Sequence, residues 1–144
     1  MAKNNTGQWS LTLLRVVLGI MFAYHGYAKL FVAGGFKMTA GFMASVLGVS
    51  PAAGAWAALV VSVLEFAGGL FLVAGLLTRW VSLLLIIELL VAFFKVHLKN
   101  GFFISQQAYG YEYVLVILAS LVVVFASGAG KIALGKVFKN RQLQ

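Results

Sequence analysis

The sequence contains no cysteine, no aspartate and only one proline, Pro51, in its 144 residues. Without cysteine the chain has no disulfides, no thiol redox couple, no iron–sulfur ligation and no covalent c-type haem. No covalently bound cofactor is therefore expected, and any redox chemistry must be carried by a molecule that binds reversibly.

Charge is also scarce. Charged residues make up 10% of the chain and hydrophobic residues 62%. In a typical soluble domain about 25% of the residues are charged and about 45–50% are apolar. So few charges cannot coat a water-facing surface, which excludes an ordinary soluble globular protein. The length allows about four membrane spans of about 20 residues each. We therefore expect one transmembrane domain covering residues 1–144.

The charges that remain are mostly basic, with 11 lysines and arginines against three glutamates and a net charge of +8. In a soluble protein this balance would suggest nucleic acid. Here the basic residues lie beside apolar runs, where they anchor helices at the interface and set topology. The expected partner is the lipid bilayer, and no nucleic acid is expected.

The apolar runs predict an all-α transmembrane four-helix bundle, because they are too long and too continuous for strands. The expected spans cover residues 9–31, 52–77, 80–98 and 111–127. Thr78-Arg79-Trp80 is expected to form a polar turn between the second and third spans. The short apolar run from Met38 to Val49 predicts a re-entrant or interfacial helix between the first two spans.

The distribution of basic residues predicts the orientation. With four spans, both termini share one side of the membrane. That side carries six basic residues, namely Lys3, Arg79, Lys131, Lys136, Lys139 and Arg141. The opposite loops carry Lys29, Lys37, Lys95 and Lys99. The positive-inside rule then predicts cytoplasmic termini, in a bacterial-type cytoplasmic membrane.

Polar residues within the spans are the candidate functional positions, because a charge inside a membrane helix costs several kcal/mol unless it pairs or reaches water. In the first span Arg15, Phe22, Gly26 and Lys29 recur at spacings of 7, 4 and 3 residues, with His25 alongside. At about 100° per residue they share one face. That face is expected to point into the bundle.

Depth along the spans predicts two polar layers. Arg15, Glu65 and Glu88 lie at depths that allow Arg15 to pair with Glu88, or to reach Glu65 near the midplane. An outer layer that would line the opening of the site consists of His25, Lys29, His97, Tyr111 and Glu112. We expect a ligand-binding or proton-handling site formed by these eight residues.

Structural roles for the same residues stay open. For Arg15 the alternative is a buried ion pair that fixes helix packing and binds no ligand. For Glu112 the alternative is a carboxylate that stabilises the helix dipole and has no other role. His25 and His97 can be ordinary hydrogen-bonding partners. Two isolated histidines on different spans give little support for haem ligation, and no metal site is expected.

Several motifs follow one another along the chain in a characteristic order. They are Arg15, His25-Gly26-Tyr27-Ala28-Lys29-Leu30, Glu65-Phe66-Ala67-Gly68-Gly69, Gly75-Leu76-Leu77-Thr78-Arg79, His97 with Gly101-Phe102-Phe103, and Gly110-Tyr111-Glu112. In order and spacing they resemble the DoxX family of small four-helix membrane proteins. The chain departs from the family pattern at Gly128-Ala129-Gly130, where the family has G-P-G, and at Ala133-Leu134-Gly135, which lacks the usual acid. Glu88 also lies outside the pattern.

Members of this family are described as membrane components of oxidoreductase systems. The resemblance implies a membrane component of such a system, binding a quinone or other small hydrophobic molecule in an intramembrane polar site and working with a soluble or membrane redox partner. Whether the chain itself is an enzyme stays open. The alternatives are a small proton-coupled transporter, with Glu65 as the exchanging acid, and a non-catalytic membrane anchor for a soluble redox enzyme. The small residues Gly54, Ala58 and Ser62 would permit a homodimer.

Overall fold

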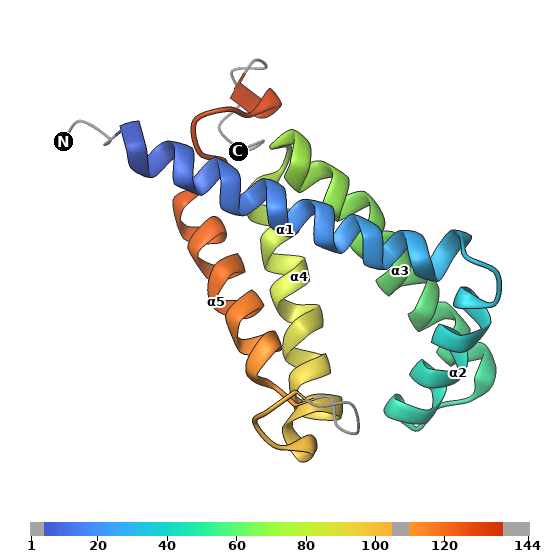
Figure 1. Cartoon of the computed structure of the whole chain (residues 1–144). Coiled ribbons are helices and arrows are strands. Elements are labelled where there is room, and N and C mark those ends of the chain that lie inside the picture. The colour runs from blue at the N-terminus through green and yellow to red at the C-terminus, as the bar shows by residue number, and fades with distance from the viewer. Residues whose placement is uncertain (1–4, 105–109, 137–144) are drawn as a thin grey trace.

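The computed structural model describes residues 5–104 and 110–136, and no strand occurs in these ranges. Its five α-helices are α1 (Asn5–Phe31), α2 (Gly35–Leu47), α3 (Pro51–Ala74), α4 (Thr78–Ala92) and α5 (Glu112–Ser127) (Figure 1). Helical structure continues beyond α4 as a π-helix, η1 (Phe93–His97), and a 3₁₀ turn, η2 (Leu98–Asn100); a short 3₁₀ turn, η3, spans Leu134–Lys136. The predicted all-α class and the short helix between the first two spans are therefore confirmed.

Three helical segments are long and apolar enough to cross a membrane: α1, α3 and the continuous stretch Thr78–Asn100. The fourth predicted span, α5, is apolar but only 16 residues long. A helix of that length rises about 24 Å, which is less than the hydrocarbon thickness of about 30 Å. The described residues thus contain three long candidate spans and one shorter apolar helix, and the four-span arrangement stays a prediction.

Local signals at the helix ends explain where α3 begins and ends. The Ser50 hydroxyl accepts a hydrogen bond from the Ala53 amide at 3.3 Å, and Pro51 occupies the first helical position, where its missing N–H is harmless. At the other end Gly75 has φ 72°, the left-handed conformation that closes a helix.

The turn between α3 and α4 corrects one prediction. The turn consists of Gly75, Leu76 and Leu77, and Thr78-Arg79-Trp80 forms the first turn of α4. Because Gly75 already reverses the chain, the three polar residues are free to begin the next helix. Thr78 is fully buried there.

α1 and α3 cross at very close range, and glycines make the contact possible. A Cβ added to Gly26 would lie 2.3 Å from the Phe66 nitrogen, and one added to Gly69 would lie 2.3 Å from the Ala23 nitrogen. Gly19 also packs against Gly69. The predicted inward face of the first span is confirmed, since Arg15, Gly19, Phe22 and Gly26 are buried on it.

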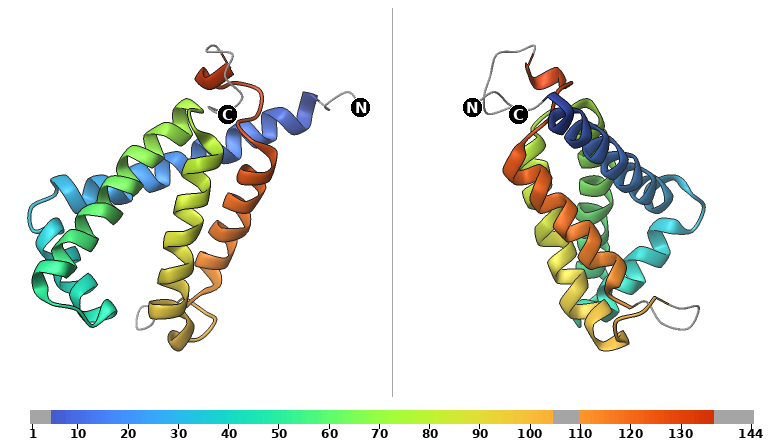
Figure 2. Two further views of the ribbon diagram at one scale, coloured as in Figure 1. Left: turned by 180° about the vertical axis from the view of Figure 1, so that it is seen from behind. Right: turned by 60° about the vertical axis from the view of Figure 1, so that its left-hand side comes forward.

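α4 and α5 form a second pair that runs side by side, and α2 packs on α3 (Figures 1 and 2). The core between the pairs is aliphatic, with Leu72, Leu85, Leu121 and Val124 fully buried. Towards the end of the molecule that holds α2 and η1, α3 diverges from α4 (Figure 2). This divergence makes room for the candidate site.

The segment after α5 folds back across the beginning of α1. The Lys131 amide donates to the Thr12 hydroxyl at 2.8 Å and to the Gln8 carbonyl at 3.1 Å, and the Gly135 amide donates to the Gly75 carbonyl at 3.3 Å. The structure makes this segment part of the packed domain.

Candidate functional site

Lys29 and Glu65 form an ion pair between α1 and α3, in which the Lys29 Nζ donates to the Glu65 Oε2. The Lys29 side chain is 24% exposed and the Glu65 side chain 8%. The close crossing of the two helices creates the pair, because Gly26 rests directly on the backbone of Phe66. Lys29 is one helical turn beyond Gly26, and Glu65 immediately precedes Phe66.

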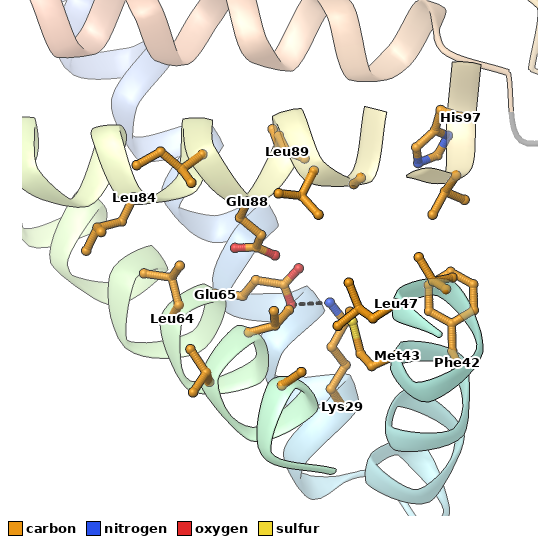
Figure 3. A pocket seen from close by; sticks show the side chains of 18 residues that line it. Lys29, Phe42, Met43, Leu47, Leu64, Glu65, Leu84, Glu88, Leu89 and His97 are labelled. Atoms are coloured by element: carbon orange, nitrogen blue, oxygen red, sulfur yellow. Dashed lines mark hydrogen bonds and ion pairs between the residues drawn. The ribbon is translucent and has the colours of Figure 1, made fainter. Parts of the chain in front are cut away.

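Glu88 of α4 completes a cluster with this pair. Its carboxyl group faces that of Glu65 (Figure 3). Two carboxylates that face each other repel, so the neutral form of the cluster has one ammonium, one carboxylate and one carboxylic acid. Neutrality suits a site of low dielectric, where an unpaired charge is expensive. The Glu88 Oε2 is buried and has no hydrogen-bond partner among the described residues.

The cluster lies at the wall of a cavity of about 440 Å³ between α2, α3 and α4, called here the larger cavity. Most of its lining is aliphatic, from residues such as Leu64 of α3 and Leu89 of α4 (Figure 3). Phe42 and Met43 of α2 close the opposite side. The polar groups therefore meet an apolar chamber.

The residues at the rim of the larger cavity indicate which environment the cavity opens to. Four aliphatic residues on the rim are exposed at the surface of α3 and α4: Val60, Leu84, Ile87 and Val91. Both helices belong to segments long and apolar enough to cross a membrane. In a bilayer, exposed aliphatic side chains on such segments would face lipid, and the larger cavity would then open sideways into the membrane.

The π-helix η1 determines which of its side chains line the larger cavity. Val96 and His97 line it, whereas Lys95 is exposed and does not. In a regular α-helix Lys95, seven residues after Glu88, would share the Glu88 face. The wider π turn shifts this register, so that His97 enters the lining instead. Single π turns of this kind are frequent at functional sites.

A second cavity, of about 300 Å³, lies between the end of α1 and the first turns of α2, and is called here the smaller cavity. Its lining consists of Lys29, Met38, Thr39, Phe42 and Met43. Lys29, Phe42 and Met43 also line the larger cavity. The Lys29 side chain therefore borders both spaces.

Arg15 does not take part in this cluster, and the predicted pairing of Arg15 with Glu65 or Glu88 is wrong. The Arg15 Nη2 donates to the Ile132 carbonyl at 2.8 Å, and a Cβ on Gly75 would lie 2.0 Å from its Nη1. The arginine is held between the turn after α3 and the segment after α5. Glu65 pairs with Lys29 instead, because the crossing of α1 and α3 brings those two side chains together.

The predicted outer layer is also not a single site. Lys29 and His97 line the larger cavity, but His25 is exposed and lines neither cavity. The Glu112 Oε1 accepts a hydrogen bond from the Ile104 amide at 2.7 Å and so holds the loop before α5. The Tyr111 ring packs edge-on against two aromatic rings, those of Phe93 and Phe102, each at 5.4 Å. Neither Tyr111 nor Glu112 lines either cavity.

α2 contributes residues to both cavities that were not predicted from the sequence. Thr39, Phe42, Met43, Val46 and Leu47 line one or both cavities. Their spacing of three, one, three and one residues is the signature of one helix face. This pattern was readable in the sequence, and it indicates a helix that closes a site.

Comparisons with known proteins find one matching family and two similar sequences. The model of the DoxX family matches residues 10–98, a range that contains Lys29, Glu65 and Glu88. A protein of Haemophilus influenzae described as an uncharacterized protein is 35% identical over 130 residues, covering 89% of this chain and 90% of the relative. A second uncharacterized protein of that organism is 32% identical over 68 residues, covering 47% of this chain and 44% of the relative. No solved structure matches the chain.

Proposed function

The chain belongs to the DoxX family, and from this premise we propose that it is the membrane component of an oxidoreductase system and binds a quinone-like molecule in the larger cavity. One observation carries the proposal. The unpartnered Oε2 of Glu88 lies at the wall of a mostly apolar cavity that opens towards lipid. A lipid-soluble molecule with a polar oxygen would satisfy that group.

The cavity fits such a ligand in size and lining. Its volume of about 440 Å³ falls within the range of about 300–1,000 Å³ typical of small-molecule sites. Such sites combine apolar walls with a few placed polar groups. Here the aliphatic side chains of α3 and α4 provide the walls, and Glu88, Lys29 and His97 provide the polar groups.

Each polar residue then has a distinct role. The Glu88 carboxyl would hydrogen-bond a carbonyl or hydroxyl oxygen, and the Lys29–Glu65 pair would keep the Glu88 region neutral. His97, at the far part of the cavity, would provide a second polar contact. The aliphatic walls would exclude water. When bound, a quinone supplies two-electron, two-proton redox chemistry.

The proposal includes a setting in the cell. The lysine and arginine distribution favours a bacterial-type cytoplasmic membrane with both termini in the cytoplasm. Electrons would then be exchanged with a soluble or membrane redox partner.

Photo-crosslinking tests the proposal directly. The full-length protein in lipid nanodiscs is irradiated with an azido-quinone, and the modified peptides are identified by mass spectrometry. We expect modification of the α2, α3 and α4 segments that line the larger cavity, reduced by an excess of unmodified quinone.

Two matched valines on α3 provide the control. Val60 lies on the rim and Val63 does not, and both are exposed. Val60→Trp should block the cavity and abolish the specific modification, while Val63→Trp should leave it unchanged. Equal labelling of all lipid-facing helices, unaffected by Val60→Trp, would contradict the proposal.

A proton-coupled transporter is the second candidate, and one observation favours it. The carboxyl groups of Glu65 and Glu88 face each other at the wall of a cavity (Figure 3), and Arg15 lies elsewhere. An acid in this setting can exchange a proton for a substrate. Uptake of ethidium into proteoliposomes, driven by a pH gradient and lost in Glu88→Gln, would favour this candidate over a quinone site.

A further inference from the structure

Two cavities share Lys29 in their linings, which raises the question of what connects them. Lys29 borders both, while Phe42 and Met43 of α2 lie between the two spaces and line each of them. The Lys29 side chain forms an ion pair with Glu65, and the Glu65 carboxyl group faces that of Glu88 (Figure 3). A chain of polar groups thus leads from the smaller cavity to the larger one, where Glu88 Oε2 ends it without a partner.

The surroundings of the smaller cavity place its opening at the polar boundary of the membrane. Residues 32–34, directly after α1, are exposed and not helical. Irregular loops that are exposed to lipid do not occur within the hydrocarbon layer. Lys37, at the start of α2, is also exposed, as expected for an interfacial cation. Met38, on the cavity rim, is 76% exposed.

We propose that Lys29, Glu65 and Glu88 form a proton relay that supplies the larger cavity from water through the smaller cavity. The larger cavity opens to lipid, which cannot deliver protons. The smaller cavity opens where water is present, with the Thr39 hydroxyl in its wall. The relay rests on the proposed function only in assigning a use to the delivered proton.

The transfers balance with no further reactant. When the proton shared by the two glutamates leaves through Glu88 Oε2, two carboxylates face one ammonium. Lys29 then gives a proton to Glu65, which again shares it with Glu88. The neutral amine of Lys29 takes a proton from water in the smaller cavity, and the hydroxide that remains passes to bulk water. One proton enters, one leaves, and the cluster regains its original charge.

The neighbouring titratable groups are few. Lys29 comes from α1, Glu65 from α3 and Glu88 from α4, and His97 of η1 lies at the far part of the larger cavity (Figure 3). Among the residues that line the two cavities, α2 contributes only uncharged side chains. The relay therefore has a single cation as its link to the smaller cavity.

Infrared spectroscopy of the full-length protein in nanodiscs tests the relay without any quinone. After transfer to D₂O, the carbonyl band of the protonated carboxyl shifts as its proton exchanges, and loss of the band in Glu88→Gln assigns it to the shared proton. Thr39→Trp fills the smaller cavity and should slow the exchange at least about tenfold, a barrier increase of about 1.4 kcal/mol. Lys29→Met, which removes the link itself, should slow it similarly if the variant folds.

Two tryptophan controls make the result decisive. Ser45→Trp adds the same bulk to an exposed position of α2 that lines neither cavity, and Val60→Trp blocks the rim of the larger cavity. Both should leave the exchange rate within about twofold of the unaltered protein. Unchanged exchange in Thr39→Trp, or equal slowing by Val60→Trp, would overturn the relay. Because no quinone is present, either result leaves the crosslinking test of the proposed function unaffected.

Discussion

The Lys29 ammonium of α1 pairs with the Glu65 carboxylate of α3 at the point where the two helices cross most closely. The crossing and the ion pair depend on each other. Gly26 and Gly69 let the backbones touch, and that contact places the two charged groups side by side in a segment where neither could stay ionised alone. The site is thus built into the main packing interface of the molecule.

Lys29→Met should lower the free energy of unfolding by about 2–3 kcal/mol, because it leaves Glu65 without its cation inside a membrane segment. Thermal unfolding of the purified protein in nanodiscs measures the effect. Adding Glu65→Gln to Lys29→Met removes the stranded charge, so the double variant should be more stable than Lys29→Met alone. A double variant that shows the full sum of the two single losses would mean that the residues do not interact.

Glu88→Gln should change the free energy of unfolding by less than about 1 kcal/mol, in contrast to Lys29→Met. A glutamine amide can donate to the Glu65 carboxylate much as a protonated Glu88 does, and the Lys29–Glu65 pair stays intact. The same unfolding assay applies. A loss as large as that of Lys29→Met would indicate that Glu88 carries the charge that Lys29 neutralises, and would reassign the shared proton to Glu65.

The inward face of the first span could be predicted because it depends only on helical periodicity. Arg15, Gly19, Phe22 and Gly26 recur at helical spacing, and a polar residue within an apolar helix turns inward whatever it finally contacts. The same reasoning selected Lys29, Glu65 and Glu88 as functional candidates. All three line the larger cavity.

The interaction partners of Arg15 and Glu65 could not be predicted from the sequence, because they depend on how the helices cross. Counting residues from the membrane surface assumes parallel, equally tilted helices, and on that assumption Arg15 matched the glutamates in depth. In the structure the segment after α5 returns to α1 and provides the Ile132 carbonyl for Arg15. The π turn at Phe93–His97 is likewise invisible to a count that assumes 3.6 residues per turn.

Gly69→Ala should destabilise the protein by about 1–3 kcal/mol, since its methyl group would collide with the α1 backbone at Ala23 and Gly19. The adjacent Gly68 is a matched control. Its Cβ would meet only side chains, the nearest being the Val81 Cγ1 at 3.1 Å. Gly68→Ala should therefore unfold within a few degrees of the unaltered protein. Similar losses for both variants would contradict the close crossing of α1 and α3.

Thr12→Val should loosen the segment after α5, because the Thr12 hydroxyl accepts hydrogen bonds from the Lys131 amide at 2.8 Å and the Ile132 amide at 3.4 Å. The expected loss of stability is about 1 kcal/mol. Limited proteolysis should cut faster near Lys131, which is exposed. Ser10→Ala is the control, since its hydroxyl bonds only within α1, to the Thr6 carbonyl. Faster cleavage in Ser10→Ala than in Thr12→Val would argue against this role for Thr12.

His97→Ala should weaken quinone binding, whereas Lys95→Ala should not, because the π turn directs His97 into the larger cavity and leaves Lys95 exposed. Loss of one hydrogen bond of about 1 kcal/mol corresponds to a dissociation constant about fivefold higher. Microscale thermophoresis with a short-chain quinone measures both variants. A regular α-helical register would reverse the ranking, since Lys95 would then share the Glu88 face. The order of the two dissociation constants therefore tests the π turn and the proposed ligand site together, and thermal unfolding of His97→Ala checks that its fold is retained.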